Sequence, residues 1–244
     1  MVGMVIAGHM PLAPFLIASA IAFSSVFLML GIPPTQRDDS RNPLSFLYTL
    51  RTLRTLRSDR TLILFASGSL LSTIVHGRYT LYLSQFLLVA YKPAEALKIP
   101  SALLACNAIT VILMPYQIGR FLKRERLRYW ILLGTVLFIA GLIGFSQADS
   151  LLTWCLAMFV FILDEMIIYP SEYLFIDTIA PDTLRGSYYG AQNLAAFGGA
   201  MSPVICGYLL INAAPTSMFY ALGALTAVGG TLCFLSGRRV AGSC

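Results

Sequence analysis

Two long apolar runs follow each other within residues 129–175, which read YWILLGTVLFIAGLIGFSQADSLLTWCLAMFVFILDEMIIYPSEYLF. The first run, residues 129–147, contains no charged side chain, and the second, residues 151–175, is apolar apart from three acidic residues. A helix needs about 20 consecutive apolar residues to cross the hydrocarbon core of a bilayer. Both runs have that length, so we predict two membrane-spanning helices here.

The composition of the whole chain supports a membrane protein. Of its 244 residues, 57% are hydrophobic and 11% are charged, whereas roughly 25% are charged in an ordinary soluble domain. A water-soluble fold of this length cannot bury so much apolar surface, and the composition also excludes disordered and disulfide-stapled secreted chains. The net charge is +6, but the basic residues lie between the apolar runs, so no nucleic-acid partner is expected.

The remaining apolar runs complete the predicted fold class, an all-α polytopic membrane helix bundle of about seven spans. One of them, residues 61–91, is too long for a single untilted crossing, so we predict one crossing by a helix that is broken or bent near Gly77. A short apolar stub precedes the first full span. The further predicted spans are residues 11–32, 61–91, 99–118, 188–211 and 215–236.

The basic residues between the spans predict the orientation of the chain. With the spans assigned as above, fourteen Arg and Lys side chains fall on one side and only Lys92 and Lys98 on the other. The side rich in Arg and Lys is expected to be cytoplasmic, which places the C-terminus inside. In the basic linker, leucines recur every three residues from Leu47 to Leu56 with arginines between them. Such a helix could lie on the anionic inner leaflet or pack on protein, and both alternatives stay open.

The two ends of the chain match weakly when they are offset by 204 residues, so that Gly3 meets Gly207 and Pro11 meets Pro215. This match suggests that the chain opens with the end of one repeat and continues into a complete one. The expected organisation is residues 1–32 as the end of a first repeat, 33–60 as a cytoplasmic basic amphipathic linker, 61–236 as a complete six-helix half, and 237–244 as a cytoplasmic tail.

Residues 169–209 read YPSEYLFIDTIAPDTLRGSYYGAQNLAAFGGAMSPVICGYL. They contain A-P-x-x-x-R-G, which ends at Arg185 and Gly186, and then G-x-x-x-x-P-x-x-x-G. This stretch resembles the tenth and eleventh helices of the major facilitator superfamily, specifically its bacterial multidrug-efflux drug/proton antiporters. The segment LLACNAITVILMPYQIGRFLKR, residues 103–124, resembles the eighth helix and the loop after it. The resemblance covers the carboxy-terminal half of such a protein, and therefore implies an amino-terminal half as a partner.

The loop after the eighth helix carries a signature G-x-x-x-D-R-x-G-R-R in this family, and the match here is partial. Gly119 stands at its first glycine and Arg124 at its first arginine, whereas Lys123 replaces the aspartate and Arg126 the second glycine. Together with Arg185 and Gly186, these residues are expected to belong to the cytoplasmic loops and gate. The alternative is that the loop only supplies positive charge on the inner side.

Asp164 and Glu165 lie near the middle of a predicted span. A carboxylate at the bilayer centre costs several kcal/mol unless it is paired, hydrated or protonated. We therefore predict Glu165, with Asp164 beside it, as a proton-coupling site, although a structural carboxylate bonded to a neighbouring helix is also open. Glu172 follows seven residues later, about 10 Å along the same helix face, and is assigned to the inner gate or a cap.

Other polar side chains in the spans predict a substrate cavity, made of Arg78, Tyr79, Tyr82 and Asn107. The open alternative is a bent helix with an aromatic belt and an interhelical hydrogen bond. Small residues also recur every four positions along residues 187–207, which predicts a helix face for close packing or a bending gate helix. These residues are Ala191, Ala195, Gly199, Pro203 and Gly207.

The predicted function is a secondary active transporter of a bacterial inner membrane, which exports small amphipathic or cationic molecules in exchange for protons. Its partners would be the lipid bilayer, the small-molecule substrate and protons, with no cofactor and no metal. One alternative is a non-transporting truncated fragment that needs a partner half. A weaker one is a membrane-embedded transferase that holds Mg²⁺ on Asp164, Glu165, Glu172 and Asp177. No enzyme motif is present, and His9 and His76 are too few and too separated for a metal site.

Overall fold

The computed structural model describes residues 16, 19–20, 23–25, 52 and 54–241. The chain divides into two units, Met1–Thr49 and Leu50–Cys244, which are treated separately. In the first unit the described residues are helical, and Ser24 Oγ donates a hydrogen bond to the Ala20 carbonyl oxygen at 2.8 Å. Most of the predicted first span, residues 11–32, and most of the basic linker, residues 33–60, lie outside the described residues.

The second unit is built from helices throughout residues 54–241. The fold class predicted from sequence, a helical membrane bundle, is therefore confirmed. The helices are α4 (Arg60–His76), α5 (Tyr79–Ala90), α6 (Pro93–Leu113), α7 (Pro115–Phe121), α8 (Leu127–Ser146), α9 (Leu151–Ile179), α10 (Arg185–Asn193), α11 (Ala196–Asn212) and α12 (Ser217–Ala241), with short 3₁₀ turns at Arg124–Arg126 and Asp182–Leu184.

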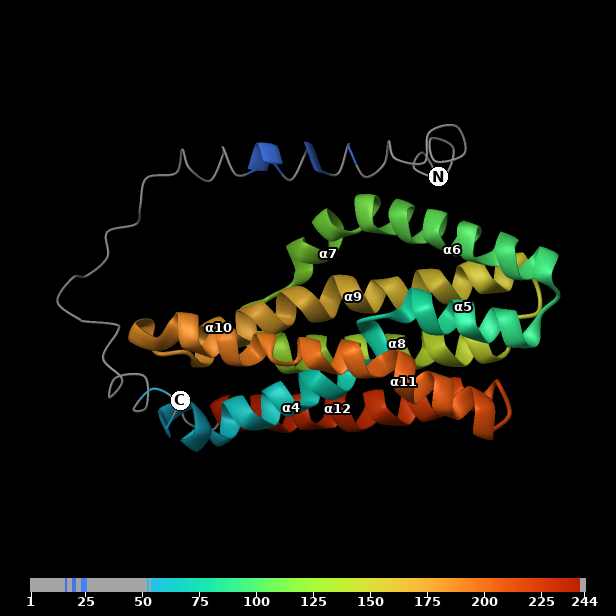
Figure 1. Cartoon of the computed structure of the whole chain (residues 1–244). Helices are drawn as coiled ribbons and strands as arrows, with labels where there is room; N and C mark the ends of the chain where they lie inside the picture. The colour runs from blue at the N-terminus through green and yellow to red at the C-terminus, as the bar shows by residue number, and fades with distance from the viewer. Residues whose placement is uncertain (1–15, 17–18, 21–22, 26–51, 53, 242–244) are drawn as a thin grey trace. The chain divides into compact units, whose positions relative to one another are not determined.

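The helices of this unit run back and forth along one direction (Figure 1). α4 and α5 lead from one end of the bundle to the other, α6 and α7 return, and α8, α9, the α10–α11 pair and α12 continue the alternation. As a result, the start of α4, the α7–α8 connection and the α9–α10 connection share one end. The first two of these connections are rich in arginine and the third carries Arg185, whereas Lys92 precedes α6 at the opposite end.

Four helical segments among the described residues are long and apolar enough to cross a membrane: Arg124–Ser146, Leu151–Ile179, Asp182–Asn212 and Ser217–Gly237. A fifth candidate is the pair Lys98–Leu113 and Pro115–Phe121, which is bent by 49°. The bend falls at Pro115, because proline lacks the N–H that would continue the helix. The predicted span 61–91 consists of two shorter apolar helices, α4 and α5, and the break at Gly77 agrees with the sequence prediction.

The helices of the second unit pack in a closed order. Around the bundle, α9 contacts α8, α8 contacts α12, α12 contacts α4, α4 contacts α11, α11 contacts α5, α5 contacts α6, and α6 contacts α9. Buried aromatic side chains fill the interior, among them Trp154, Phe138, Phe145 and Phe161. Exposed apolar side chains such as Ile112, Val204 and Ile211 face outward, which suits contact with lipid chains.

Candidate functional site

The acidic side chains within the bundle come from one helix, α9, which carries Asp164, Glu165, Glu172 and Asp177. Ser150 starts this helix with a capping box, in which its hydroxyl accepts a hydrogen bond from the Thr153 backbone N–H at 3.3 Å. The 29-residue helix then runs without interruption, although it contains Pro170. The four carboxyl groups have different neighbours: two of them form ion pairs with basic side chains, and two do not.

Asp164 forms an ion pair with His76, the last residue of α4, through Asp164 Oδ2 and His76 Nε2. Both side chains are buried, with 0% of Asp164 and 5% of His76 exposed. The imidazole stacks on Phe138 of α8, with ring centroids 3.8 Å apart and planes 17° apart. Gly134 of α8 makes room for the carboxyl group, since a Cβ there would lie 2.8 Å from Asp164 Oδ1. The pair thus links α4 and α9 in the apolar interior.

His76 is not among the site residues predicted from the sequence, although the sequence contains a signal for it. His76 is an ionisable residue within an apolar run, directly before the helix break at Gly77, and such residues usually mark an interaction inside the membrane. Its partner could not be read from the sequence, because that requires the register of α4 against α9. The predicted roles of Asp164 and Glu165 in proton coupling remain predictions.

Glu165 is half-buried, and no Lys, Arg or His of residues 54–237 forms an ion pair with it. It lies close enough to interact electrostatically with His76, Tyr79 and Tyr169. Tyr79 begins α5, and its hydroxyl accepts a hydrogen bond from Asn107 Nδ2 of α6. The structure therefore brings two predicted cavity residues, Tyr79 and Asn107, together on the side of the bundle where Glu165 lies.

The other two predicted cavity residues are placed differently. Arg78 is exposed at the α4–α5 break, where it precedes the first turn of α5. Tyr82 is completely buried in the aromatic core, and its hydroxyl has no hydrogen-bond partner among the described residues. Tyr82 nevertheless lies close enough to interact electrostatically with Tyr79 and Glu165. Three of the four predicted cavity residues are therefore brought together near Glu165, and Arg78 is not.

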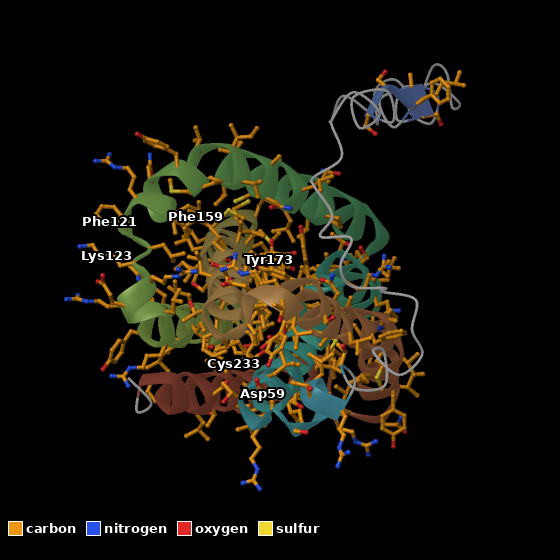
Figure 2. All side chains as sticks on the ribbon, turned by 90° about the vertical axis from the view of Figure 1, so that its left-hand side faces the viewer. Asp59, Phe121, Lys123, Phe159, Tyr173 and Cys233 are labelled. Atoms are coloured by element: carbon orange, nitrogen blue, oxygen red, sulfur yellow. The ribbon has the colours of Figure 1, made fainter. Side chains whose placement is uncertain are left out.

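Glu172 lies farther along α9, in a polar surrounding. Its carboxylate accepts hydrogen bonds from Ser69 Oγ of α4 at 2.7 Å and from Gln192 Nε2 of α10 at 3.2 Å. A cavity of about 190 Å³ opens beside it, lined by Thr73, Tyr169, Glu172, Tyr173, Gln192, Asn193, Ala195 and Ala196. Figure 2, a view along the bundle, shows Tyr173 within the ring of helices and Lys123 projecting away from it.

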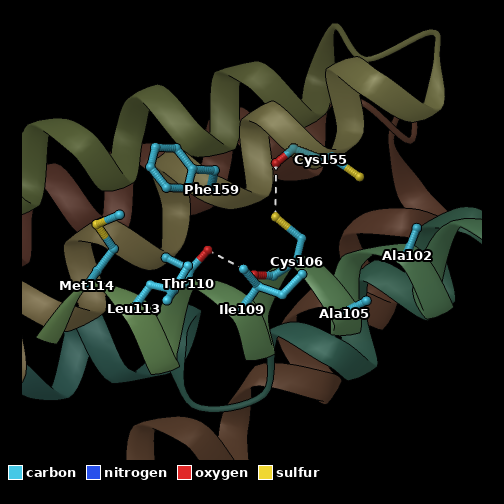
Figure 3. A pocket seen from close by; sticks show the side chains of 9 residues that line it. All are labelled: Ala102, Ala105, Cys106, Ile109, Thr110, Leu113, Met114, Cys155 and Phe159. Atoms are coloured by element: carbon cyan, nitrogen blue, oxygen red, sulfur yellow. Dashed lines mark hydrogen bonds between the residues drawn. The ribbon is translucent and has the colours of Figure 1, made fainter.

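A second cavity, of about 400 Å³, lies between α6 and α9 and is apolar. Figure 3 shows the Cys106 thiol directed at the carbonyl oxygen of Cys155, 3.4 Å away, and the Thr110 hydroxyl directed at the carbonyl oxygen of Cys106. No charged side chain lines this space. It therefore offers contact area to an apolar group but no ionic interaction.

The charged residues near the arginine-rich end of the bundle converge on Asp177. Arg124 forms an ion pair with Asp177 Oδ2, and Arg185 Nη1 lies 3.5 Å from Asp177 Oδ1. Arg185 also reaches Asp182 at 3.2 Å. Two of the predicted loop residues, Arg124 and Arg185, thus share one carboxylate. Gly119 and Gly186 have open space where a side chain would be, so neither packs closely against the described part of the chain.

The acidic residues of α9 do not converge into a metal site. Asp164 is occupied by His76, and Asp177 by two arginines. Among the described residues, no group of three or more His, Cys, Asp or Glu side chains is arranged to hold a metal ion.

The predicted ridge of small residues runs along two helices that are separated by one irregular turn. Residues 187–207 are divided by a break at Leu194 and Ala195, so Ala191 belongs to α10 while Gly199, Pro203 and Gly207 belong to α11. Turn-like hydrogen bonds replace the helical ones there, such as Ala195 N–H to the Gln192 carbonyl oxygen at 2.9 Å. Leu194 and Ala195 keep right-handed helical backbone angles, and Asp182–Asn212 remains one apolar helical segment, so the packing ridge stays a prediction.

Gly199 packs against Gly77, the residue between α4 and α5. A Cβ at Gly77 would lie only 2.7 Å from Gly199 Cα. Gly198 is closer still to α4, and a Cβ there would overlap the Leu70 carbonyl oxygen. Gly207 has open space around it. The close approach between α4 and α11 is therefore made by Gly198 and Gly199, beside the two helix breaks.

Comparison with known proteins agrees with this architecture. Residues 1–203 match the Major Facilitator Superfamily. The chain is 34% identical over 182 residues to the uncharacterized MFS-type transporter YdeE of Escherichia coli (strain K12), covering 74% of this chain and 46% of that protein. It is 24% identical over 165 residues to the uncharacterized MFS-type transporter YqjV of Bacillus subtilis (strain 168), covering 66% and 40%.

The chain thus spans less than half the length of these curated relatives. No solved structure matches it. The family match covers more than half of the chain, and the relatives are named as transporters rather than enzymes. With its helical bundle and apolar spans, the chain belongs to the major facilitator superfamily.

Proposed function

We propose that the chain takes part in proton-coupled export of small amphipathic or cationic molecules across a bacterial inner membrane. The observation that supports this function best is Glu165. It sits midway along an apolar helix, half-buried, without a cationic partner among the described residues, while its neighbour Asp164 is neutralised by His76. A carboxylate in that position is stable when it is protonated or when it binds a cation. Proton and cationic substrate then compete for one group.

Exchange of the two ligands also needs helices that can rearrange. α4–α5 and α10–α11 are both broken near their middles, and they meet at Gly77 and Gly199 beside the His76–Asp164 pair. Discontinuous helices near a midplane site are a recurrent feature of secondary transporters. The bundle can therefore bend at these breaks, which the proposed exchange at Glu165 requires.

The test is Glu165→Gln, which keeps the shape of the side chain and removes its titration. The purified chain is placed in vesicles, and efflux of a cationic dye such as ethidium is followed after a pH gradient is imposed. Glu165→Gln is expected to abolish the dependence of efflux on the gradient, whereas Glu125→Gln, at an exposed loop position, should behave like the wild type. Unchanged proton-driven efflux in the Glu165 variant would refute this role.

A second candidate function is that of a half-transporter, which transports only together with a partner half. It is favoured because the chain covers 46% and 40% of the length of its relatives. The same vesicles separate the two candidates. Gradient-driven efflux from vesicles that hold the wild-type chain alone would exclude a need for a partner. Efflux that appears only after co-expression with the amino-terminal half of the Escherichia coli relative would favour the second candidate.

A further inference from the structure

The polar cavity beside Glu172 is separate from the position of Glu165, and its chemistry indicates a ligand. Glu172 is partly buried within the bundle, and no Arg, Lys or His of the described residues forms an ion pair with it. His76, which interacts electrostatically with Glu172, is already paired with Asp164. Two neutral donors, Ser69 and Gln192, bind the carboxylate but bring no positive charge. A partly buried carboxylate inside an apolar bundle, with no cationic side chain beside it, is stabilised by a proton or an external cation.

A second group in the cavity points to the same kind of ligand. Gln192 is only 7% exposed, and its Nε2 donates to Glu172, but its Oε1 has no hydrogen-bond partner among the described residues. A buried acceptor left without a donor costs free energy, because it has lost its hydrogen bonds to water. The cavity therefore presents one negative carboxylate and one unused neutral acceptor, and both are complementary to a positively charged hydrogen-bond donor.

The rest of the lining selects among cations. Tyr169 and Tyr173 both border the space, and aromatic faces attract cations that lie over them. A volume of about 190 Å³ is much larger than a bare metal ion needs but smaller than the usual pocket for a drug-sized molecule. A primary ammonium group supplies three N–H donors and one positive charge, which suits Glu172, Gln192 Oε1 and the tyrosines together.

We propose that the cavity between α4, α9 and the α10–α11 break binds the primary ammonium end of a small organic molecule, with Glu172 and Gln192 as its principal ligands. The site differs from Glu165 in position and in its hydrogen-bond partners, Ser69 and Gln192, although Tyr169 lies near both carboxyl groups. Its occupation does not require proton exchange, so it is testable without any transport measurement.

Binding is measured by calorimetry on the purified wild-type chain in lipid nanodiscs, with butylammonium as the probe. 1-Butanol tests the need for charge, and tetramethylammonium, which has no N–H, tests the need for donors. Butylammonium is expected to bind at least about tenfold more tightly than either, since a hydrogen bond to a charged group contributes roughly that factor or more. Failure of the wild-type chain to bind butylammonium, or equal binding of 1-butanol, would overturn the proposal.

Glu172→Gln is expected to weaken butylammonium binding at least about tenfold, and Gln192→Met, which removes the free acceptor, by several-fold. Glu125→Gln removes an exposed carboxylate and should leave the affinity unchanged. If Glu172→Gln does not yield a folded protein, Tyr173→Leu, at a half-exposed lining position, tests the cavity instead. Wild-type affinity in the folded Glu172 variant, or in both other lining variants, refutes the site. A chain that binds butylammonium but shows no gradient-driven efflux contradicts only the proposed transport function.

Discussion

At the scale of single residues, α9 shows how differently four carboxyl groups of one helix are stabilised. Asp164 has His76, Asp177 has two arginines, and Glu165 and Glu172 have no cationic partner among the described residues. The sequence predicted that acidic residues in this span would be important, because their cost in a bilayer must be offset. Which acid is paired could not be predicted, because every partner lies on another segment of the chain.

The His76–Asp164 pair gives a prediction about stability. Replacing either residue with leucine leaves the other buried and unpaired, so each single variant should lower the free energy of unfolding by about 3 kcal/mol. The double variant, which removes both polar groups, should lose much less than the sum of the two. Unfolding in mixed micelles, followed by circular dichroism, provides the measurement, with Glu125→Gln as the exposed control. Additive losses would show that the two side chains do not depend on each other.

At the scale of helices, the breaks determine which residues meet. The break at Gly77 and the bend at Pro115 follow from residue types that weaken or interrupt a helix. The break at Leu194 and Ala195 has neither glycine nor proline at its centre, so no local residue type predicts it. The four-residue spacing in the sequence assumes an unbroken helix, and it predicted Gly199 and Gly207 as packing positions. In the structure, Gly198 makes the tightest contact with α4.

Alanine at two glycines of α11 should therefore have clearly different effects on stability. A Cβ at Gly198 would overlap a backbone carbonyl oxygen of α4, so Gly198→Ala should destabilise the bundle by about 1–3 kcal/mol. Gly207 has open space, so Gly207→Ala should be neutral or stabilise the helix by up to about 1 kcal/mol. The same unfolding measurement tests both variants. Equal effects at the two positions would show that α4 and α11 do not approach each other at Gly198.

At the scale of the whole second unit, the distribution of charge and the path of the helices agree. The sequence analysis could predict the alternation of spans because basic residues cluster between every second pair of apolar runs. The structure brings the arginine-rich connections to one end of the bundle (Figure 1). The Arg124–Asp177–Arg185 cluster ties two of these connections together. The sequence could not predict the packing order of the helices, because apolar runs of similar composition do not specify their neighbours.

The orientation of this unit in the membrane remains a prediction, and fusions of a reporter test it directly. The end with the α7–α8 connection should face the cytoplasm, because arginine-rich loops are retained on that side during insertion. A reporter that is active only in the cytoplasm should therefore be active when it is fused after Arg239 or inserted at Glu125. The same reporter should be inactive at Pro93, which begins α6 at the opposite end. Activity at Pro93 equal to that at Arg239 would contradict the alternation, whereas a reversal at all three positions would contradict only the orientation.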